Sequence, residues 1–516
     1  MTAIITDRYR IGQARLAYNR LLNSSDLYYL GIGRAIAWDS ESSPDTPDVD
    51  PQDDRDARLA LQSIKKIANF TPAVPRYTWT SGNSYDQWDD ADPDLSTKQF
   101  YVYNSSNQSV YVCLKKGSST STTEPTSTGS GVPTAGADGY IWKFLYTIDA
   151  TSSNKYLTTE YIPVLRDTTV AAAAVQGAIH NLKIVSGGVG YSSAPTIAIQ
   201  GDGSGATATC TVSSGAINTI TVTAVGSGYT YARCVLSGGS PSTAGELRPI
   251  IAPVSIGREI DSITVDTAGT GYTNGTKTLV LTGDGYNGDV DITVTANAYV
   301  NGSEVINAAG YGYTQCTAAS PESTTGTAAA FTVNFSSSKG GFGYDPVVDL
   351  NARYIMFNVE LDGAEGSGDF FINQDFRQIV IVKNPLDLTS GGQKAFSAST
   401  GFAVNYLDVE VGGTWVVDDI IEGGSSSAQA YIVYYDSGTE RVYISQDVTT
   451  GFGAFTSGEA LAAIGSGTSA GDVASGGQTN DAEFDKFSGE LLYLENRVAV
   501  TRATGQSEDI KITVKY

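Results

Sequence analysis

A dense apolar run flanked by charged and amide side chains, which could recognise a partner, lies close to the end of the chain, in SGELLYLENR at residues 488–497. Glu495 and Arg497 are two positions apart, so both side chains lie on one face of a strand. A carboxylate and a guanidinium in this arrangement pair with a neighbouring subunit or with each other. The alternative is a salt bridge inside one domain, at the end of a strand. In each case the chemistry is recognition by charge and hydrogen bonds.

The sequence has no P-loop motif for phosphate binding and no histidine placed for the usual hydrolase triad. The string nearest to a P-loop, GTGYTNGTKT at 269–278, has Thr276 where the lysine should be and the wrong glycine spacing. There is no HExxH, and His180, the single histidine, lies far from any elbow-like serine, precedes an apparent strand and is expected to be structural. We therefore predict no catalytic residues, no cofactor and no enzymatic activity.

Metal binding is not predicted either. GDGYNGDVD at 283–291 carries Asp284, Asp289 and Asp291, but the spacing fits neither an EF-hand nor a calcium-binding nonapeptide, so a polar turn is expected. The cysteines are too far apart for a metal knuckle or a dense disulfide framework, so free thiols are expected; they are Cys113, Cys210, Cys234 and Cys316.

Composition limits the class of partner. The chain has 516 residues and a formal net charge of -23, which repels a phosphate backbone and argues against nucleic acid. No apolar window is long enough to span a bilayer, so no membrane partner is expected. The start, MTAIITDRYR, lacks the features of a secretory signal, which favours the cytoplasm of the cell that makes the protein.

Several elements follow from hydrophobic periodicity. Residues 7–22 are expected to form an amphipathic helix capped by Thr6 or Asp7. LYYLGIGRAIAW indicates a strand and a glycine turn, followed by an acidic, proline-rich surface loop. Residues 54–68 suggest a second helix, and QFYVYNSSNQSVYVCLKKG a β-hairpin.

A repeat occupies residues 179 to 345. The marker is G-x-G-Y after a short strand, ending at Tyr191, Tyr229, Tyr272, Tyr313 and Tyr344. A second marker, GDG, occurs at 201 and again at 283, a period of 82 residues. Glycines permit positive φ in such turns and the tyrosine can close over them. The pattern predicts a duplicated all-β module.

Two later stretches, at 346–388 and 481–516, have the same apolar and charged composition as the first third of the chain, and we call all three the dense segments. This pattern suggests one core interrupted by two insertions. We expect an α+β, β-dominated fold with a discontinuous, sandwich-like core and flanking helices. Insertions of this kind are tolerated because loop-closure entropy grows slowly with length. The expected segments are core at 1–169, 346–388 and 481–516, a glycine- and tyrosine-rich repeat module at 170–345, and a small barrel or sandwich at 389–480.

The dense segments resemble the small baseplate wedge subunit of T-even-like contractile-tailed bacteriophages. The matching strings, in order, are AIITDRYRIGQARLAYNRLL, YYLGIGRAIAW, VPRYTW, DGYIWKFLYTI, TEYIPV, FRQIVIVKNPLD and SGELLYLENR, running to ITVKY. They lie within the core segments, which make up about half of the chain, and the two inserted modules depart from the family pattern.

The resemblance implies a non-enzymatic structural protein of the virion, located in the tail baseplate after assembly in the host cytoplasm. It implies a homodimer that contacts other wedge proteins and supports rearrangement of the baseplate when the tail contracts. Arginine, aromatic and polar residues in the dense segments are the interface candidates: Arg34, Trp38, Arg76, Trp79, Arg377, Asn384, Tyr493, Glu495, Asn496 and Arg497.

Two other functions remain open from the residues. The inserted β-repeats would serve a receptor-binding or glycan-binding tail module, because tyrosines and tryptophans on β modules can make stacking platforms for sugars. A polysaccharide depolymerase needs only a pair of suitably spaced carboxylates, and an acidic β-rich chain offers many. Most aromatic residues in strands fill cores or subunit interfaces instead.

Overall fold

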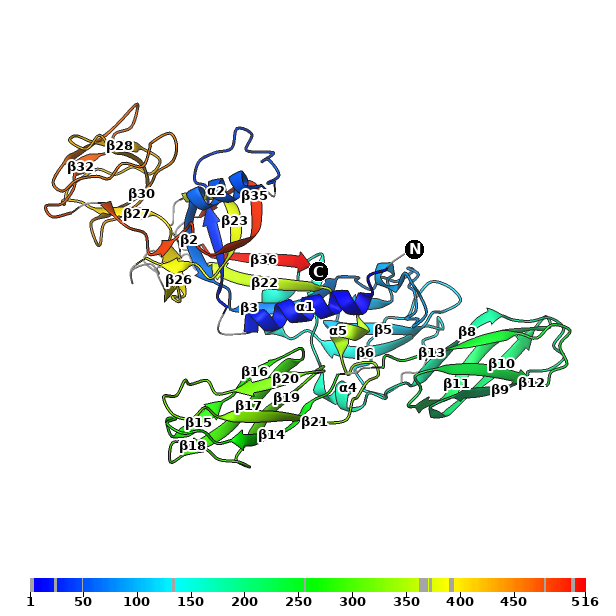
Figure 1. Cartoon of the computed structure of the whole chain (residues 1–516). Helices are drawn as coiled ribbons and strands as arrows, with labels where there is room; N and C mark the ends of the chain where they lie inside the picture. Colours follow the sequence, from blue (N-terminus) through cyan, green and yellow to red (C-terminus); the bar gives the residue numbers. More distant parts are fainter. Residues whose placement is uncertain are drawn as a thin grey trace. The chain divides into compact units, whose positions relative to one another are not determined.

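The computed structural model describes residues 4–22, 26–48, 50–131, 135–254, 257–361, 370, 374–388, 394–477, 479–502 and 506–516. The fold is α+β and dominated by strands, as expected, with short helices set among many small sheets (Figure 1). The described chain divides into two compact units. Unit 1 comprises 1–22, 71–356 and 513–516, and unit 2 comprises 23–70 and 357–512.

Both units are discontinuous in sequence, and each gathers pieces of more than one expected core segment. The division falls inside three strands, β3 (Asn69–Pro75), β22 (Tyr354–Leu361) and β36 (Glu508–Lys515). With β7 (Tyr161–Pro163), these strands form a sheet in the order β36-β22-β3-β7.

Unit 1 begins with the expected amphipathic helix, α1 (Asp7–Leu22). The Thr6 hydroxyl accepts a hydrogen bond from the Tyr9 amide at 3.3 Å, so the capping prediction is confirmed. Ile11, Ala14 and Tyr18 are buried at helical spacing. On the same helix Arg15 forms an ion pair with Asp345, 2.8 Å from Nη2 to Oδ2, which joins parts of unit 1 that are 330 residues apart.

The predicted hairpin is present as β4 (Tyr101–Asn104) and β5 (Ser109–Lys115), extended by β6 (Ile141–Thr147) into a three-stranded sheet. Aromatic side chains such as Tyr85, Tyr140 and Trp142 fill its core. The remaining short elements of unit 1 outside the repeats are η1 (Leu95–Thr97), α3 (Ala150–Tyr156), α4 (Thr168–Ala172) and α5 (Pro346–Asp349).

The duplicated module consists of two repeats, 179–251 (repeat A) and 260–335 (repeat B), both drawn in green shades in Figure 1. Repeat A contains β8 (Ile179–Ser186), β9 (Thr196–Gly201), β10 (Ser204–Ser213), β11 (Ala216–Ser227), β12 (Ala232–Ser237) and β13 (Glu246–Ile251). Repeat B contains β14 (Ile260–Thr267), β15 (Gly275–Thr278), β16 (Val280–Gly283), β17 (Tyr286–Thr295), β18 (Ala298–Tyr299), β19 (Val305–Tyr311), β20 (Cys316–Ala319) and β21 (Ala330–Phe335).

The two repeats share one pairing scheme. The first strand pairs with the last, β8 with β13 and β14 with β21; β9 pairs with β12 as β16 pairs with β20; and β10 pairs with β11 as β17 pairs with β19. Each repeat encloses its own apolar cluster. The duplication read from the G-x-G-Y and GDG markers is therefore visible as a duplicated strand topology.

The five tyrosines of the G-x-G-Y turns are buried, and four of them accept a hydrogen bond from a main-chain amide. The Tyr191 hydroxyl accepts a hydrogen bond from the Gly245 amide at 2.9 Å, and in repeat B Tyr272 accepts from Ala329 at 2.8 Å. Tyr313 accepts from the Gly288 amide at 3.2 Å. Because a buried hydroxyl needs a partner, these bonds fix each ring over its turn.

Unit 2 is built on a five-stranded sheet in the order β26-β2-β1-β23-β35. Its strands are β26 (Thr400–Phe402), β2 (Leu61–Lys66), β1 (Tyr28–Gly33), β23 (Gln374–Lys383) and β35 (Glu490–Arg502), and helix α2 (Pro51–Ala60) precedes β2. Tyr29, Ile64, Val380 and Phe396 belong to one buried cluster in this unit.

The predicted helix at 54–68 is wrong over its second half. Helix α2, capped by the Asp50 carboxylate, ends at Ala60, and the chain continues directly as strand β2. Leu61 and Ile64 are buried in the core of the sheet. Apolar residues at these positions fit both helical and strand spacing, and pairing of β2 with β1 and β26 decides in favour of the strand.

The second module is a seven-stranded sheet in the order β32-β31-β28-β29-β30-β27-β33. Its strands are β27 (Asn405–Asp408), β28 (Ile420–Gly423), β29 (Gln429–Asp436), β30 (Arg441–Ser445), β31 (Ala460–Ala463), β32 (Ala470–Asp472) and β33 (Thr479–Asn480). A bridge from Val409 to Val473 links the β32 end back toward β27, which curls the sheet around one apolar core as a small barrel.

The stretch before this barrel belongs with the core sheet, although the sequence placed it in the second module. Strand β26 pairs with β2, and Phe396 packs in the buried cluster of the five-stranded sheet. A small sheet of β24 (Leu386–Asp387), β25 (Lys394–Ala395) and β34 (Phe484–Asp485) joins the entry and exit of the insertion. The barrel itself therefore starts at β27.

Candidate functional site

Three of the strings that carry the family resemblance lie side by side in unit 2. YYLGIG is β1, DFRQIVIVK forms most of β23, and ELLYLENR opens β35. Strand β23 pairs with β1 on one side and with β35 on the other. Segments more than 340 residues apart thus form neighbouring strands, and the interface candidates in them are brought together by the sheet.

The end of β1 is shaped by Gly33. A side chain there would place its Cβ 2.5 Å from the Ala60 carbonyl oxygen, so only glycine fits. Arg34 follows with a φ of 58° and donates its amide to the same oxygen at 2.8 Å. This left-handed residue turns the chain into the acidic surface loop that begins at Ala35.

A cluster that we name the arginine–tryptophan seam, consisting of Arg34, Trp38, Glu41, Arg377 and Arg497, lies where this loop meets β23 and β35. The Arg34 guanidinium lies 3.7 Å from the centroid of the Trp38 ring, a cation–π contact. The Trp38 indole donates to the main-chain oxygen of Arg497 at 2.9 Å.

Arg377 is the buried centre of the seam, with 6% of its surface exposed. Its Nε donates to Glu41 at 2.7 Å, its Nη2 to Asp375 at 3.1 Å, and its Nη1 to the Ala35 carbonyl. Partial desolvation of Glu41 raises its pKa, but the hydrogen bonds from Arg377 and the Trp38 amide outweigh it and lower that pKa. The two side chains are therefore held as an ion pair.

A β-bulge in β35 explains why the loop docks at this point. Gln378 pairs with Asn496 and Phe376 with Val500, so Arg377 alone faces residues 497–499. The bulge leaves main-chain groups without a ladder partner. Two main-chain groups of the bulge bond to the loop instead. The Arg497 oxygen accepts a hydrogen bond from the Trp38 indole, and the Ala499 amide donates to the Glu41 carboxylate.

Two other interface candidates in unit 2, Asn496 and Asn384, form hydrogen bonds to the main chain of neighbouring segments. Asn496 accepts from the Gln378 side chain at 2.8 Å and donates to the Asp45 carbonyl at 2.9 Å. Asn384, with a φ of 51°, accepts from the Leu27 amide at 2.7 Å and donates to Asp26 at 3.0 Å, where β23 ends and β1 begins.

Glu495 takes a different partner from the one expected. It accepts a hydrogen bond from the Tyr493 hydroxyl at 2.8 Å. Burial and this carboxylate raise the pKa of Tyr493. Both residues lie inside strand β35 and not at its end. Arg497 keeps a buried Nε that has no hydrogen-bond partner within the described part of the chain.

Arg76 and Trp79 belong to unit 1 and not to the seam. Arg76 lies 4.9 Å from the centroid of the Tyr103 ring and donates to the Thr158 carbonyl at 2.8 Å. Trp79 donates its indole N–H to Ser121 at 3.1 Å. Both stabilise the surroundings of the three-stranded sheet.

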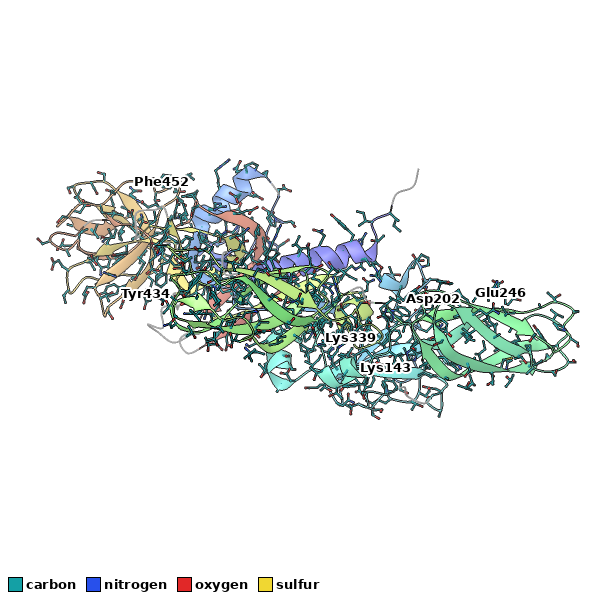
Figure 2. The ribbon with its side chains drawn as sticks, turned by 60° about the horizontal axis from the view of Figure 1, so that its bottom comes forward. Lys143, Asp202, Glu246, Lys339, Tyr434 and Phe452 are labelled. Atoms are coloured by element: carbon teal, nitrogen blue, oxygen red, sulfur yellow. The ribbon has the colours of Figure 1, made fainter. Side chains whose placement is uncertain are left out.

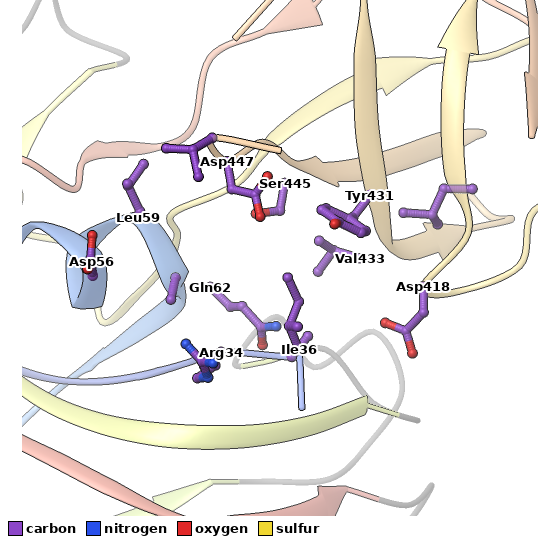
Figure 3. Close-up of a pocket in the computed structure, with 14 residues that line it drawn as sticks. Arg34, Ile36, Asp56, Leu59, Gln62, Asp418, Tyr431, Val433, Ser445 and Asp447 are labelled. Atoms are coloured by element: carbon purple, nitrogen blue, oxygen red, sulfur yellow. The ribbon is translucent and has the colours of Figure 1, made fainter. Parts of the chain in front are cut away.

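A cavity of about 330 Å³ adjoins the seam inside unit 2 (Figure 3). Its lining combines the core sheet and barrel: Arg34, Ala35, Ile36, Asp56, Leu59, Ala60, Gln62, Asp418, Tyr431, Ile432, Val433, Ser445, Asp447 and Val448. A second hollow of about 430 Å³ shares Ile36, Asp418 and Tyr431 and includes Arg377.

Charges in these hollows are partly desolvated. Burial and the nearby Arg377 lower the pKa of Arg34, and burial and the nearby Asp375 raise the pKa of Asp418, although Arg377 opposes the latter. Groups with unfavourable desolvation gain from a partner that supplies the opposite charge. Sequence reasoning identified Arg34 and Arg377 but missed Glu41, Asp418 and Tyr431, which lie in segments that read as solvent-exposed loop or insertion.

Two of the three aspartates expected in a polar turn, Asp284 and Asp291, have hydrogen-bond partners within repeat B. Asp284 accepts amide hydrogen bonds from Thr314 at 2.8 Å and Gln315 at 3.0 Å, and Asp291 accepts from Asn307 at 2.9 Å. Burial lowers the pKa of His180 to about 4. The described residues contain no group of three or more histidine, cysteine or acidic side chains arranged to hold a metal, and their cysteines are free thiols.

No described helix combines the length and the apolar character needed to cross a bilayer. Comparison with known proteins gives no family: no family model and no curated protein matches this chain.

Proposed function

We propose that this protein is a non-enzymatic structural subunit of a contractile-tailed phage baseplate wedge, which acts by binding other wedge proteins and a second copy of itself. The observation that carries the proposal is the adjacency of β1, β23 and β35. These strands contain three of the strings that resemble the wedge subunit, and a shared sheet gives a physical reason for such strings to occur together.

Strand β35 offers a surface for this role. It is 13 residues long and last in the order of its sheet, so among the described strands one of its edges has no strand partner. Leu492 and Val498 on this strand are 47% and 50% exposed, and Phe487 just before it is 54% exposed. Long edge strands with apolar side chains favour pairing with another chain. We infer that a second copy covers this edge.

Localisation in the particle tests the proposal. The chain is tagged in the phage genome, tails are purified from lysed host cells, and the tag is located by immunogold electron microscopy. We expect label at the baseplate end of the tail and a dimer of the purified protein in sedimentation. Label on the head or along the sheath, or a chain found only outside particles, would contradict the proposal.

A further inference from the structure

Tyr231 is the exception among the tyrosines of the two repeats. Its side chain is 66% exposed, whereas all other tyrosines in residues 179–344 are buried, and all of these are described. The same region turns its aromatic rings inward everywhere else, so core packing does not explain this one.

Three other exposed polar residues, Gln200, Asp202 and Arg233, lie close to Tyr231 at the end of the β9–β12 strand pair. Arg233 pairs with Gln200 across β12 and β9, and their side chains are joined at 3.0 Å from Nη2 to Oε1. Asp202 and Tyr231 lie one residue beyond the paired ends of β9 and β12, and the Tyr231 amide donates to the Asp202 carboxylate, so both adjoin the Gln200–Arg233 pair. Figure 2 labels Asp202 on repeat A.

The backbone under Tyr231 is fixed. The Asp202 carboxylate accepts the Thr230 amide at 2.9 Å and the Tyr231 amide at 3.2 Å. A Cβ on Gly201 would lie 2.2 Å from the Tyr231 carbonyl oxygen, so the two strands approach closely here. A preformed surface loses little conformational entropy when a ligand binds.

We propose that this surface of repeat A binds a neutral hexopyranose unit of a polysaccharide. The Tyr231 ring would stack on the apolar C–H face of the sugar. Arg233 and the Gln200 amide would donate to hydroxyl oxygens, and Asp202 would accept from a hydroxyl. A sugar ring presents one apolar face and a rim of groups that both donate and accept, which matches an aromatic ring bordered by donors and an acceptor.

The charge of Asp202 favours a neutral sugar over an acidic one. Hydrogen bonds from the Thr230 hydroxyl and the Thr230 amide hold its pKa at about 2, so the carboxylate is ionised near neutral pH. This anion offsets the Arg233 cation, so the proposed site carries no net charge that would attract an acidic sugar. This site is separate from the assembly surface of unit 2, and neither proposal depends on the other.

Repeat B provides an internal comparison. Its Asp284 makes the same clasp to Thr314 and Gln315. Gln315 and Thr317 occupy the positions that correspond to Tyr231 and Arg233 in the matching strand pair. The turn thus folds without an exposed aromatic ring or a guanidinium. The turn therefore does not require the residue types of Tyr231 and Arg233, which supports the proposal that they serve ligand binding.

The test uses full-length protein and soluble oligosaccharides of glucose, galactose and mannose, with a uronate oligosaccharide as the acidic counterpart, in saturation-transfer NMR and calorimetry. The main variant, Tyr231→Gln with Arg233→Thr, carries the residues of repeat B. We expect a neutral oligosaccharide to bind the natural protein and to bind this variant at least tenfold more weakly. Gln200→Ala, a milder surface change, should weaken binding severalfold, and Gln315→Ala in repeat B should not change it.

Three results would overturn the proposal. They are an absence of binding to every neutral oligosaccharide, binding that both the double variant and Gln200→Ala retain in full, or binding of the uronate oligosaccharide alone. Equal melting temperatures for natural protein and variants would show that a loss of binding is not a loss of folding.

Discussion

The indole nitrogen of Trp38 donates a hydrogen bond to the main-chain oxygen of Arg497, 459 residues further along the chain, at 2.9 Å. This bond ties the loop after β1 to the bulge of β35. The same loop supplies Glu41 to the buried Arg377. The seam therefore joins the first and last segments of unit 2. We expect substitutions in it to lower the stability of unit 2 directly, and to affect assembly only by changing the shape of β35.

Two substitutions of Trp38 distinguish the contribution of its hydrogen bond to stability from the contribution of its ring. Trp38→Phe keeps an aromatic ring under Arg34 and should cost about 1 kcal/mol, the usual net value of one hydrogen bond. Trp38→Ala also removes the cation–π contact and buried area and should cost about 3 kcal/mol. Urea denaturation gives the energies, and hydrogen exchange should show faster exchange at residues 497–499. Val411→Ala, at a side chain 82% exposed on the barrel, is the control.

Arg377 is the most sensitive residue of the seam. Arg377→Met leaves Glu41 and Asp375 without their cation and should destabilise unit 2 by about 3 kcal/mol. Arg377→Lys keeps the charge but loses the fork of donors, so an intermediate loss is expected. Because the pKa of Glu41 is lowered in the fold, its contribution is present above the unfolded pKa and fades as pH falls through the folded value. The methionine variant should show less of this acid sensitivity.

The barrel contains a carboxylate whose titration should be measurable by itself. Burial raises the pKa of Glu459, but amide hydrogen bonds from Thr456, Ser426 and Ser425 outweigh it and bring the pKa to about 2. The folded pKa is depressed, so the stabilisation is complete above about pH 4.5 and is lost toward pH 2; it amounts to at most about 3 kcal/mol.

Glu459→Gln should therefore lower the urea midpoint at pH 7 and have a much smaller effect at pH 2.5. Glu422→Gln, a substitution of another acidic residue of the barrel, serves as the matched comparison. An equal loss at both pH values would contradict the assignment.

Gly285 and Tyr313 should be coupled in repeat B. A Cβ on Gly285 would lie 2.4 Å from ring atoms of Tyr313, so Gly285→Ala should destabilise the repeat by about 3 kcal/mol. Tyr313→Ala creates a cavity but removes the clash, so the double variant should be less unstable than the sum of the two. In repeat A a Cβ on Gly203 meets main-chain atoms at 2.5 Å as well as the Tyr229 ring, and Tyr229→Ala should not rescue Gly203→Ala.

The exposed edge of β35 should control self-association. Leu492→Asp together with Val498→Asp puts two charges on this strand and should turn a dimer into a monomer in sedimentation without lowering the melting temperature. Arg497→Ala and Tyr493→Ala should weaken the dimer less, since their side chains are only partly exposed. A double aspartate variant that remains dimeric would place the contact elsewhere.

The sequence predicts this molecule best where a local pattern has one solution. Helix 7–22 has a cap and a clear apolar face. The duplicated module is indicated by glycines and tyrosines that its turns require. The β-dominated class follows from many short alternating runs. The fold class and the duplication of the all-β module were therefore predictable from the sequence, whereas the pairing of the strands was not.

The remaining features depend on partners distant in sequence. Leu61 and Ile64 fit a helix until β1 and β26 are placed beside them. Phe396 lies in a stretch that resembles insertion, yet it packs against Tyr29 with ring centroids 5.6 Å apart. Glu41 lies in a loop whose composition indicates solvent, and only the buried Arg377 gives it a role. No local pattern records which distant cation an acidic residue will meet.

The separation of Trp38 and Arg497 also has a consequence for biosynthesis. Translation adds roughly 5–20 residues per second, so the ribosome needs roughly 20–90 s to make the chain between them. Strands β1 and β2 are made early, but the side of β1 that receives β23 waits for more than 300 further residues. Unit 2 therefore completes its sheet only after β35 has been made, and the emerging polypeptide needs protection from premature strand pairing until then.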